Sequence, residues 1–415
     1  MAVIDLTLST DPTVDNAPAI SAALGNLVRL PPGEFSVGAT IMAWQLVGKG
    51  PGETRLKVMR EALPSELGPT GLSQRQHIRF RGIDPLGENI RVIGRNTPVA
   101  TTGRPAYLST REFEHAFDFR ACTRPKLFGC RGDYVWGDGW YIGPNEGGST
   151  PCTDLVIDDF ESLGVGRQTG AISALIGKSL IRAHRIVGLP RRSGIDVEPY
   201  LGLPVSGVEF TSCILGKTQL HPFNITGNGM ISVIWIHDND FAGNEVHIRN
   251  GKVAAGRVFR DIRFERNTHT GGVGPGVRFE GIVRPVVLDN VNDRVNNTPA
   301  STTPAIRVRA CSDVFIRRNR ATGSAQCVGP DQGTTGTIGA PLGTVGENTH
   351  IPWAGGIHLP EVVMLGTPAI EPPVDPIFAP VVPVPPPPPP PSGLTEARVR
   401  EIAREEIVKA RHFFP

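Results

Sequence analysis

A short pattern of apolar residues recurs through the middle of the chain. Two apolar residues flank one residue of any kind, and two further residues then often precede Asn or a small residue, as in "VEFTSC", "IWIHDN", "IRFERN" and "VFIRRN". The first apolar residue of each copy is Leu127, Leu155, Leu180, Val208, Ile234, Ile262, Val286 or Val314, so successive copies are 24 to 28 residues apart. This period predicts a solenoid, because a repeat of this length can bury its apolar side only against neighbouring repeats.

Each repeat also carries a second short alternating run, which begins 9 to 17 residues earlier. These runs are "AFDF", "GWYI", "GAIS", "GIDV", "PFNI", "EVHI", "GVRF" and "AIRV". Each repeat therefore contains at least two short strands, joined by bends rich in Gly and Asn. The six-residue period of left-handed β-helices and the Leu/Asn consensus of leucine-rich repeats are both absent from the sequence. The pattern predicts an all-β chain that forms a right-handed parallel β-helix.

Composition and charge exclude several other kinds of protein. With 42 Lys and Arg against 40 Asp and Glu, the formal net charge of +2 gives no global electrostatic reason to bind nucleic acid or a membrane. No apolar run approaches the roughly 18 residues of a membrane span. The six cysteines show no CxxC or CxxH spacing, so we expect buried thiols rather than a zinc site or a disulfide framework. No metal and no cofactor are predicted.

Several segments resemble known β-helix proteins. "DNAPAISAALGN" followed by "VRLPPGEFSV" resembles the start of pectate-lyase-like proteins, in which a capping helix precedes a strand of the "LPPGxY" type. "WGDGWYIG" and "SGIDVEP" resemble rungs of the same superfamily. The resemblance covers about residues 10–330 and implies the fold. It implies no single reaction, since the superfamily includes lyases, hydrolases, epimerases and purely adhesive proteins.

The sequence divides into four parts: an N-terminal cap over residues 1–60, a β-helix over 61–345, a Gly/Thr-rich to Pro-rich linker over 346–391, and a C-terminal helix over 392–415. The uninterrupted proline run predicts a stiff polyproline II spacer. In the last part Thr395 can cap a helix with one apolar stripe, which needs a partner to pack against. Its "LTEARVREIAREEI" resembles the C-terminal tails of minor tail proteins from phages of actinobacteria.

Side chains in the second run of each repeat should alternate between core and solvent, and the outward ones should stack from rung to rung about 4.8 Å apart. The first outward row is then Asp118, Tyr141, Ser173, Asp196, Asn224, His247, Arg278 and Arg307. The neighbouring row is Arg120, Gly143, Leu175, Glu198, Thr226, Arg249, Glu280 and Arg309. We therefore expect Asp196 and Glu198 to face solvent on one sheet.

Three interpretations of this polar strip stay open. It can be an ordinary solvated face that keeps a solenoid soluble. It can bind a glycan, with the binding residues Tyr141, Asn224, Arg249 and Arg278. It can also cleave a glycan, with the catalytic residues Asp196, Glu198 and His247.

Two chemistries would suit the catalytic interpretation. Asp196 and Glu198 lie two residues apart on one strand, which is about 6.6 Å and within the carboxylate separation of inverting glycosidases. A lyase would instead need a base, such as His247 or Arg249, with Arg278 to neutralise a sugar carboxylate.

Three other polar residues are given structural roles. Asp138, in "WGDGW", is interpreted as a turn residue, because Asp-Gly pairs favour turns. His221 and His237 have no metal-ligating partner at fixed spacing, and we expect both to be hydrogen-bonded.

The sequence favours a structural or adhesive phage tail component, a minor tail protein that presents a β-helix to the host cell surface and binds envelope glycan. The alternative is a tailspike-type polysaccharide depolymerase, either a hydrolase or a lyase. "MAVIDLTLSTDPTV" lacks the basic and apolar regions of a signal peptide, which favours a virion protein assembled in the host cytoplasm. The resemblance to phage tail proteins implies a trimer, so the expected partners are two further copies, other tail proteins and host cell-wall polysaccharide.

Overall fold

The computed structural model describes residues 2–351, apart from several gaps, and residues 364–365. The gaps are residues 69–70, 99–105, 189, 201, 217, 251–257, 273–274, 294–302, 325 and 331–342. The chain divides into a unit of Met1–Pro373 and a unit of Val374–Pro415. The predicted helix over 392–415 and most of the predicted linker over 346–391 lie outside the described residues.

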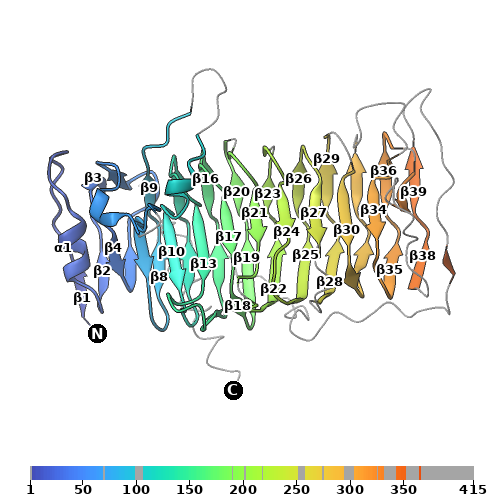
Figure 1. The fold of residues 1–415 in the computed structure, drawn as a ribbon. Helices are drawn as coiled ribbons and strands as arrows, with labels where there is room; N and C mark the ends of the chain where they lie inside the picture. The colour runs from blue at the N-terminus through green and yellow to red at the C-terminus, as the bar shows by residue number, and fades with distance from the viewer. Residues whose placement is uncertain are drawn as a thin grey trace, which may run out of the picture. The chain divides into compact units, whose positions relative to one another are not determined.

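Three long parallel sheets, here called A, B and C, run along the first unit (Figure 1). Sheet A contains β1 (Val3–Asp5), β2 (Leu27–Arg29), β5 (Gln45–Val47), β8 (Leu86–Glu88), β11 (Lys126–Phe128), β14 (Cys152–Thr153), β15 (Val156–Asp158), β18 (Leu175–Ile176), β19 (Ser179–Arg182), β22 (Val205–Thr211), β25 (Ile231–His237), β28 (Phe259–Glu265), β31 (Ile282–Val283), β32 (Val286–Leu288), β35 (Val314–Arg317), β38 (Gly343–Gly346) and β40 (Met364–Leu365). β40 pairs antiparallel with β38 at the edge.

Sheet B contains β3 (Gly33–Val37), β6 (Thr54–Val58), β9 (Arg91–Ile93), β12 (Arg131–Asp133), β16 (Glu161–Leu163), β20 (Arg185–Ile186), β23 (Ile214–Leu215), β26 (Asp240–Ala242), β29 (Thr268–Thr270), β33 (Val291–Asp293), β36 (Arg320–Thr322) and β39 (Thr349–Ile351). Sheet C contains β4 (Ile41–Ala43), β7 (Ile78–Phe80), β10 (Phe117–Arg120), β13 (Trp140–Gly143), β17 (Gly170–Ile172), β21 (Ile195–Val197), β24 (Phe223–Ile225), β27 (Val246–Arg249), β30 (Val277–Glu280), β34 (Ile306–Arg309) and β37 (Val328–Pro330).

Each rung takes one pass through the sheets in the order A, B, C, as β22, β23 and β24 do. The strands of successive rungs pair in parallel, which confirms the predicted right-handed parallel β-helix. The repeat seen in the sequence corresponds to the strands of sheet A, and the earlier run corresponds to sheet C. The third strand of each rung, in sheet B, was missed because most of these strands have three residues and two of them, Arg185–Ile186 and Ile214–Leu215, have only two, which is too short to show a period.

Apolar side chains that point inward fill the space between the sheets. Ile195 and Val197 of β21 are fully buried, as are the aromatic rings of Phe80 and Phe119, which stack 4.6 Å apart on neighbouring rungs. The six cysteines are all buried, in agreement with the prediction from their spacing, and none of them is in a disulfide. Stacking of this kind buries a continuous core that no single rung could form.

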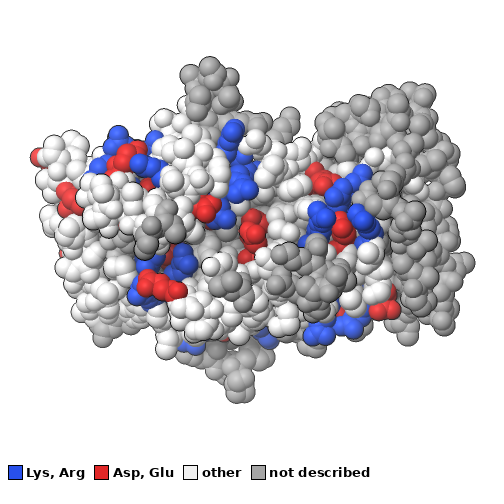
Figure 2. All heavy atoms as spheres, in the orientation of Figure 1, with Lys and Arg blue, Asp and Glu red and all other residues white. Residues whose placement is uncertain are grey.

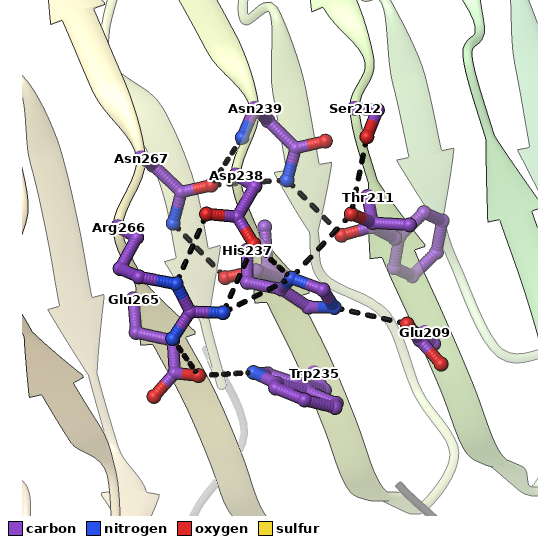
Figure 3. Close-up of polar contacts among 12 residues, drawn as sticks. Glu209, Thr211, Ser212, Trp235, His237, Asp238, Asn239, Glu265, Arg266 and Asn267 are labelled. Carbon is purple, nitrogen blue, oxygen red and sulfur yellow. Dashed lines mark hydrogen bonds and ion pairs between the residues drawn. The ribbon is translucent and has the colours of Figure 1, made fainter. Parts of the chain in front are cut away.

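A ladder of buried asparagines follows the turn from sheet A to sheet B. Asn267 donates a hydrogen bond from Nδ2 to the carbonyl oxygen of Ile236, and its Oδ1 accepts the backbone N–H of Asn239 (Figure 3). The same contacts repeat along the ladder formed by Asn239, Asn267, Asn290, Asn319 and Asn348. The residue before each of these asparagines has a positive φ, such as 51° at Arg266, so the chain turns sharply there. The asparagine side chains form hydrogen bonds with the backbone groups that this turn leaves unpaired.

The rungs begin earlier than the sequence-based boundary. β2, β3 and β4 lie within the predicted cap of residues 1–60, yet they pair with β5, β6 and β7 of the following rung. Before them stands α1 (Ala17–Ala22), whose Ala17 and Ile20 join the core and close its N-terminal end. The other described helices are single 3-10 turns, η1 (Pro64–Glu66) and η2 (Ser109–Arg111). At the other end, the last described rung reaches β39.

Candidate functional site

A cleft of about 1300 Å³ lies on the outer face of sheet C. Its floor includes outward side chains of β7, β10 and β13, and its walls come from the segments that follow β13, β21 and β24. The lining residues that matter for ligand chemistry are Arg79, Glu112, Arg120, Tyr141, Glu146, Arg167, Glu198, Tyr200 and Met230. Three carboxylates and three guanidinium groups therefore line the cleft together.

The charges on the cleft floor are fixed by a buried carboxylate. Asp118 is fully buried and accepts hydrogen bonds from Arg79 Nε at 3.0 Å and Arg120 Nε at 2.7 Å. The guanidinium of Arg120 in turn lies 4.3 Å from the ring centroid of Tyr141. Burial raises the pKa of Tyr141, so its hydroxyl stays protonated. The floor thus presents a rigid phenol and two oriented guanidinium groups.

The rim of the cleft carries apolar side chains that are open to solvent. Tyr200, after β21, is 52% exposed, and Met230, before β25, is 55% exposed. Both line the cleft. An exposed aromatic ring beside buried polar groups is a suitable surface for an amphipathic ligand.

Asp196 lies beside the cleft but is not open to solvent. Its side chain is 5% exposed, because the amides of Gln168 and Asn224 cover it and donate to Oδ2 at 2.9 Å and to Oδ1 at 2.7 Å. The expectation that Asp196 faces solvent is therefore wrong, although its strand neighbours Ile195 and Val197 do point inward. Burial, and then the nearby charge of Glu198, raise the pKa of Asp196 to about 6.

Glu198 is exposed and lines the cleft, as predicted for an outward residue. The structure therefore separates the two acids by environment: one is covered and held by amides, and the other faces the cleft. Their catalytic roles stay predictions.

The outward row predicted on sheet C is confirmed over most of its length. Asp196 pairs in register with Asn224, Asn224 with His247, and His247 with Arg278. Asn224 Oδ1 lies 2.9 Å from His247 Nδ1, so a hydrogen-bonded chain joins Asp196 to His247. Ser173 was misplaced, because Ala171 is the residue in register with Tyr141 and Asp196.

The remaining predicted residues lie further along the same sheet. Arg249 Nε is 3.1 Å from Glu280, and Arg278 Nε is 3.8 Å from Glu245. Of the seven predicted site residues, Tyr141 and Glu198 line the cleft, and the other five do not.

Sequence reasoning missed a buried ionic cluster in the turn before β13. Asp138 is fully buried, lies 3.2 Å from both Arg167 Nη1 and His115 Nδ1, and accepts the backbone N–H of Gln168. Burial opposes its ionisation, but Arg167 and His115 outweigh burial and lower the pKa of Asp138. Asp138 does lie in a turn, as predicted, but it also holds Arg167, which lines the cleft, and Gln168, which donates to Asp196. No spacing signal could have shown this, because these residues lie outside the alternating runs.

A second polar cluster lies on the outer face of sheet A (Figure 3). His237 contacts Glu209 through Nε2 at 3.0 Å and Asp238 through Nδ1 at 2.6 Å, and Arg266 also pairs with Asp238. His237 is thus hydrogen-bonded, as predicted. Its ring nitrogens are both occupied, so this cluster reads as cross-strand stabilisation rather than a site.

The described residues contain neither a candidate metal site nor a candidate membrane-spanning helix. They contain no group of three or more His, Cys, Asp or Glu side chains that could hold a metal ion. Within the same residues, no helix has the length and apolarity needed to cross a membrane. On the face drawn in Figure 2, basic and acidic side chains stand in mixed groups rather than in a field of one sign.

Several solved structures share this fold. The surface adhesin PfbA of Streptococcus pneumoniae matches with a TM-score of 0.54 and 11% identity, over 86% of this chain and 93% of that chain. DFA-IIIase from Arthrobacter chlorophenolicus, without its lid, matches with a TM-score of 0.50 and 12% identity, over 78% and 90%. The N-terminal fragment of gene product 12 of bacteriophage Phi29 has a TM-score of 0.45 and 11% identity, over 83% and 69%. No protein-family model and no curated protein matches the sequence.

Proposed function

We propose that the cleft on sheet C binds a neutral or weakly charged glycan, and that the protein is an adhesive component of a phage tail. The observation that carries the first part is the composition of the cleft, which combines exposed apolar side chains with carboxylates and guanidinium groups in equal number. Sugars offer an apolar ring face and hydroxyls that both donate and accept hydrogen bonds, so apolar side chains, carboxylates and guanidinium groups can all contact them. A cleft of about 1300 Å³ has room for several sugar units.

The assignment to a phage tail rests on the sequence of residues 392–415, whose resemblance to phage tail proteins is described above. In this proposal the apolar stripe of that segment joins three copies or docks on a neighbouring tail protein. Light scattering of the full-length chain measures the number of copies, and a monomer would rule out the trimer.

Tyr200→Ala is expected to weaken glycan binding about tenfold, or about 1.4 kcal/mol, because tyrosine is enriched among the few interface residues whose truncation costs more than about 1 kcal/mol. The ligand is cell-wall polysaccharide purified from a strain that the full-length protein sediments with, and binding is measured by calorimetry. Ile83→Ala is the matched control, since Ile83 is 60% exposed and does not line the cleft. Equal affinity of wild type and Tyr200→Ala for the polysaccharide would contradict the proposal that the rim of the cleft binds the glycan.

Cleavage of the glycan is the second candidate function, and the state of Asp196 favours it. A carboxyl group whose pKa is about 6, beside the carboxylate of Glu198, suits a general acid. Against this, both oxygens of Asp196 accept amide N–H groups and the side chain is 5% exposed. The geometry therefore supports binding better than catalysis.

Wild-type protein is expected to release no reducing or unsaturated ends from the polysaccharide that it binds. Fragments that appear with wild type and disappear with Glu198→Gln would instead make the protein a depolymerase. Glu198→Gln keeps the shape of the exposed side chain, so its folding should match that of wild type.

A further inference from the structure

Two histidines stack on neighbouring rungs of sheet C. The rings of His221, just before β24, and His247, in β27, have centroids 4.6 Å apart and planes 22° apart. Both side chains are half-buried, and neither lines the cleft described above. They lie beyond Asp196 along the same face of the sheet.

The hydrogen bonds around His247 determine which ring nitrogen carries the proton. Asn224 Nδ2 donates to Asp196 Oδ1 at 2.7 Å, so Asn224 presents its Oδ1 to His247. An amide oxygen can only accept, and therefore His247 Nδ1 must carry the hydrogen. In the neutral ring, Nε2 is then a hydrogen-bond acceptor.

The same reasoning applies to His221. Its Nδ1 lies 3.0 Å from the backbone carbonyl oxygen of Glu245, which can only accept. His221 Nδ1 therefore carries the hydrogen, and in the neutral ring Nε2 holds the lone pair. Within the described parts of the chain, neither Nε2 atom makes a hydrogen bond to protein. Neither of the two atoms is fully buried, so both can be reached from solvent.

Basic side chains surround the pair. Arg278 lies in register with His247 on β30, and Arg249 follows on β27, while Glu245 and Glu280 pair with these two arginines. Burial, and then His221, Arg278 and Arg249, lower the pKa of His247 to about 3, so its ring is neutral at physiological pH. The surface thus places two acceptors beside guanidinium donors. Phosphate and carboxylate oxygens carry no hydrogen to donate to Nε2, whereas sugar hydroxyls do.

We propose that His221 and His247 form a second sugar subsite, in which each Nε2 accepts a hydrogen bond from a hydroxyl group of a neutral sugar. Arg249 donates to an oxygen of the same ligand. Asn224 and Asp196 are positioning residues, because they act by holding His247 in the Nδ1–H form. This inference rests on the proposed glycan-binding function and extends the binding surface beyond the cleft.

Diethyl pyrocarbonate, which reacts with neutral imidazole, tests whether the acceptor nitrogens are available. Between pH 7.5 and 5.5, N-acetylhistidine in the same tube should react about tenfold more slowly, because an ordinary histidine with a pKa near 6.5 becomes protonated. His247 should react at both pH values with less than a twofold change, as mapped by mass spectrometry. A tenfold fall at His247, or no reaction there, would overturn the inference. Modification of His221 at pH 7.5 is required as well.

Variants then separate the subsite from the cleft. His247→Phe and His221→Phe keep an aromatic ring but remove the acceptor, and each should weaken polysaccharide binding about tenfold. Asn224→Ala should free the ring of His247, so that long-range ¹H–¹⁵N spectra show hydrogen on Nε2 and binding falls although His247 is still present. A purely structural role for Asn224 would not move that proton.

The outcomes distinguish the two proposals. Unchanged binding by both histidine variants, with Tyr200→Ala still defective, would overturn the subsite and leave the glycan-binding cleft standing. No binding of polysaccharide by wild type would overturn both. Should Asn224→Ala fail to fold, the histidine variants and the chemical modification still decide the question.

Discussion

Asn267→Ala is expected to lower the free energy of unfolding by about 4 kcal/mol or more. Asn267 is 2% exposed and makes four hydrogen bonds: it accepts from the backbone and the side chain of Asn239, and it donates to Ile236 and Asn290. Alanine would leave several of these buried groups unpaired, and each unpaired group costs about 1–3 kcal/mol. The loss would fall at a corner where the backbone already has a positive φ.

Urea denaturation followed by circular dichroism measures this effect, and hydrogen exchange would show faster opening on the rungs beside β28 and β29. Asn228→Ala is the matched control, because Asn228 is exposed, and its effect should stay within about 0.5 kcal/mol. A loss below about 1 kcal/mol for Asn267→Ala would show that the ladder does not stabilise the corner.

Asp196→Asn is expected to stabilise the protein by about 3 kcal/mol at pH 7. In the folded chain the pKa of Asp196 is raised from 3.8 to about 6, so between these pH values the folded state binds more protons than the unfolded state. Stability therefore falls as the pH rises through this window, by about 1.4 kcal/mol for each pH unit between the two values. Asparagine removes the buried charge. Gln168 can turn its unpartnered Oε1 toward the new amide.

Melting temperatures at pH 7 and pH 4 test this sign. The variant should melt several degrees above wild type at pH 7, and the difference should vanish near pH 4. Asp240→Asn is the control, because Asp240 is exposed on sheet B and should show no comparable gain. A variant that is less stable than wild type at pH 7 would mean that the hydrogen bonds from Gln168 and Asn224 stabilise the charged carboxylate by more than burial destabilises it. A gain would indicate that the acid is retained for function rather than for folding.

Much of the fold could be predicted because alternation reports burial directly. Strands such as Val205–Thr211 and Val246–Arg249 alternate over four or more residues, and their period gave sheets A and C. The Asn at the sixth position of several repeats could also be seen in the sequence, and these asparagines form the ladder at the turn from sheet A to sheet B. The strands of sheet B could not be seen, since a strand such as Ile214–Leu215 has no period to read.

The candidate site was predicted in part, and one error has a clear physical cause. The row was shifted at β17 because Gly170, at an inward position, carries no apolar side chain to mark it. A Cβ on Gly170 would lie 2.1 Å from the ring of Trp140, which fills the space in its place. The burial of Asp196 could not be predicted either, because Gln168 lies 28 residues earlier and covers it from a turn. Tyr200 and Met230 stand in connecting segments, where no period exists.

The backbone hydrogen bonds of all three sheets run along the axis of the solenoid, from each rung to the next. A pull along this axis therefore loads the rungs in series, and the tension that the protein bears is limited by its weakest rung junction. From Cys213 onward every corner adds asparagine bonds to that junction, whereas Phe160 and His184 occupy the same corner position in earlier rungs and supply no such bonds to the next rung. Under such a pull the β-helix should therefore come apart first on the N-terminal side of Cys213, where most of the residues that line the cleft lie.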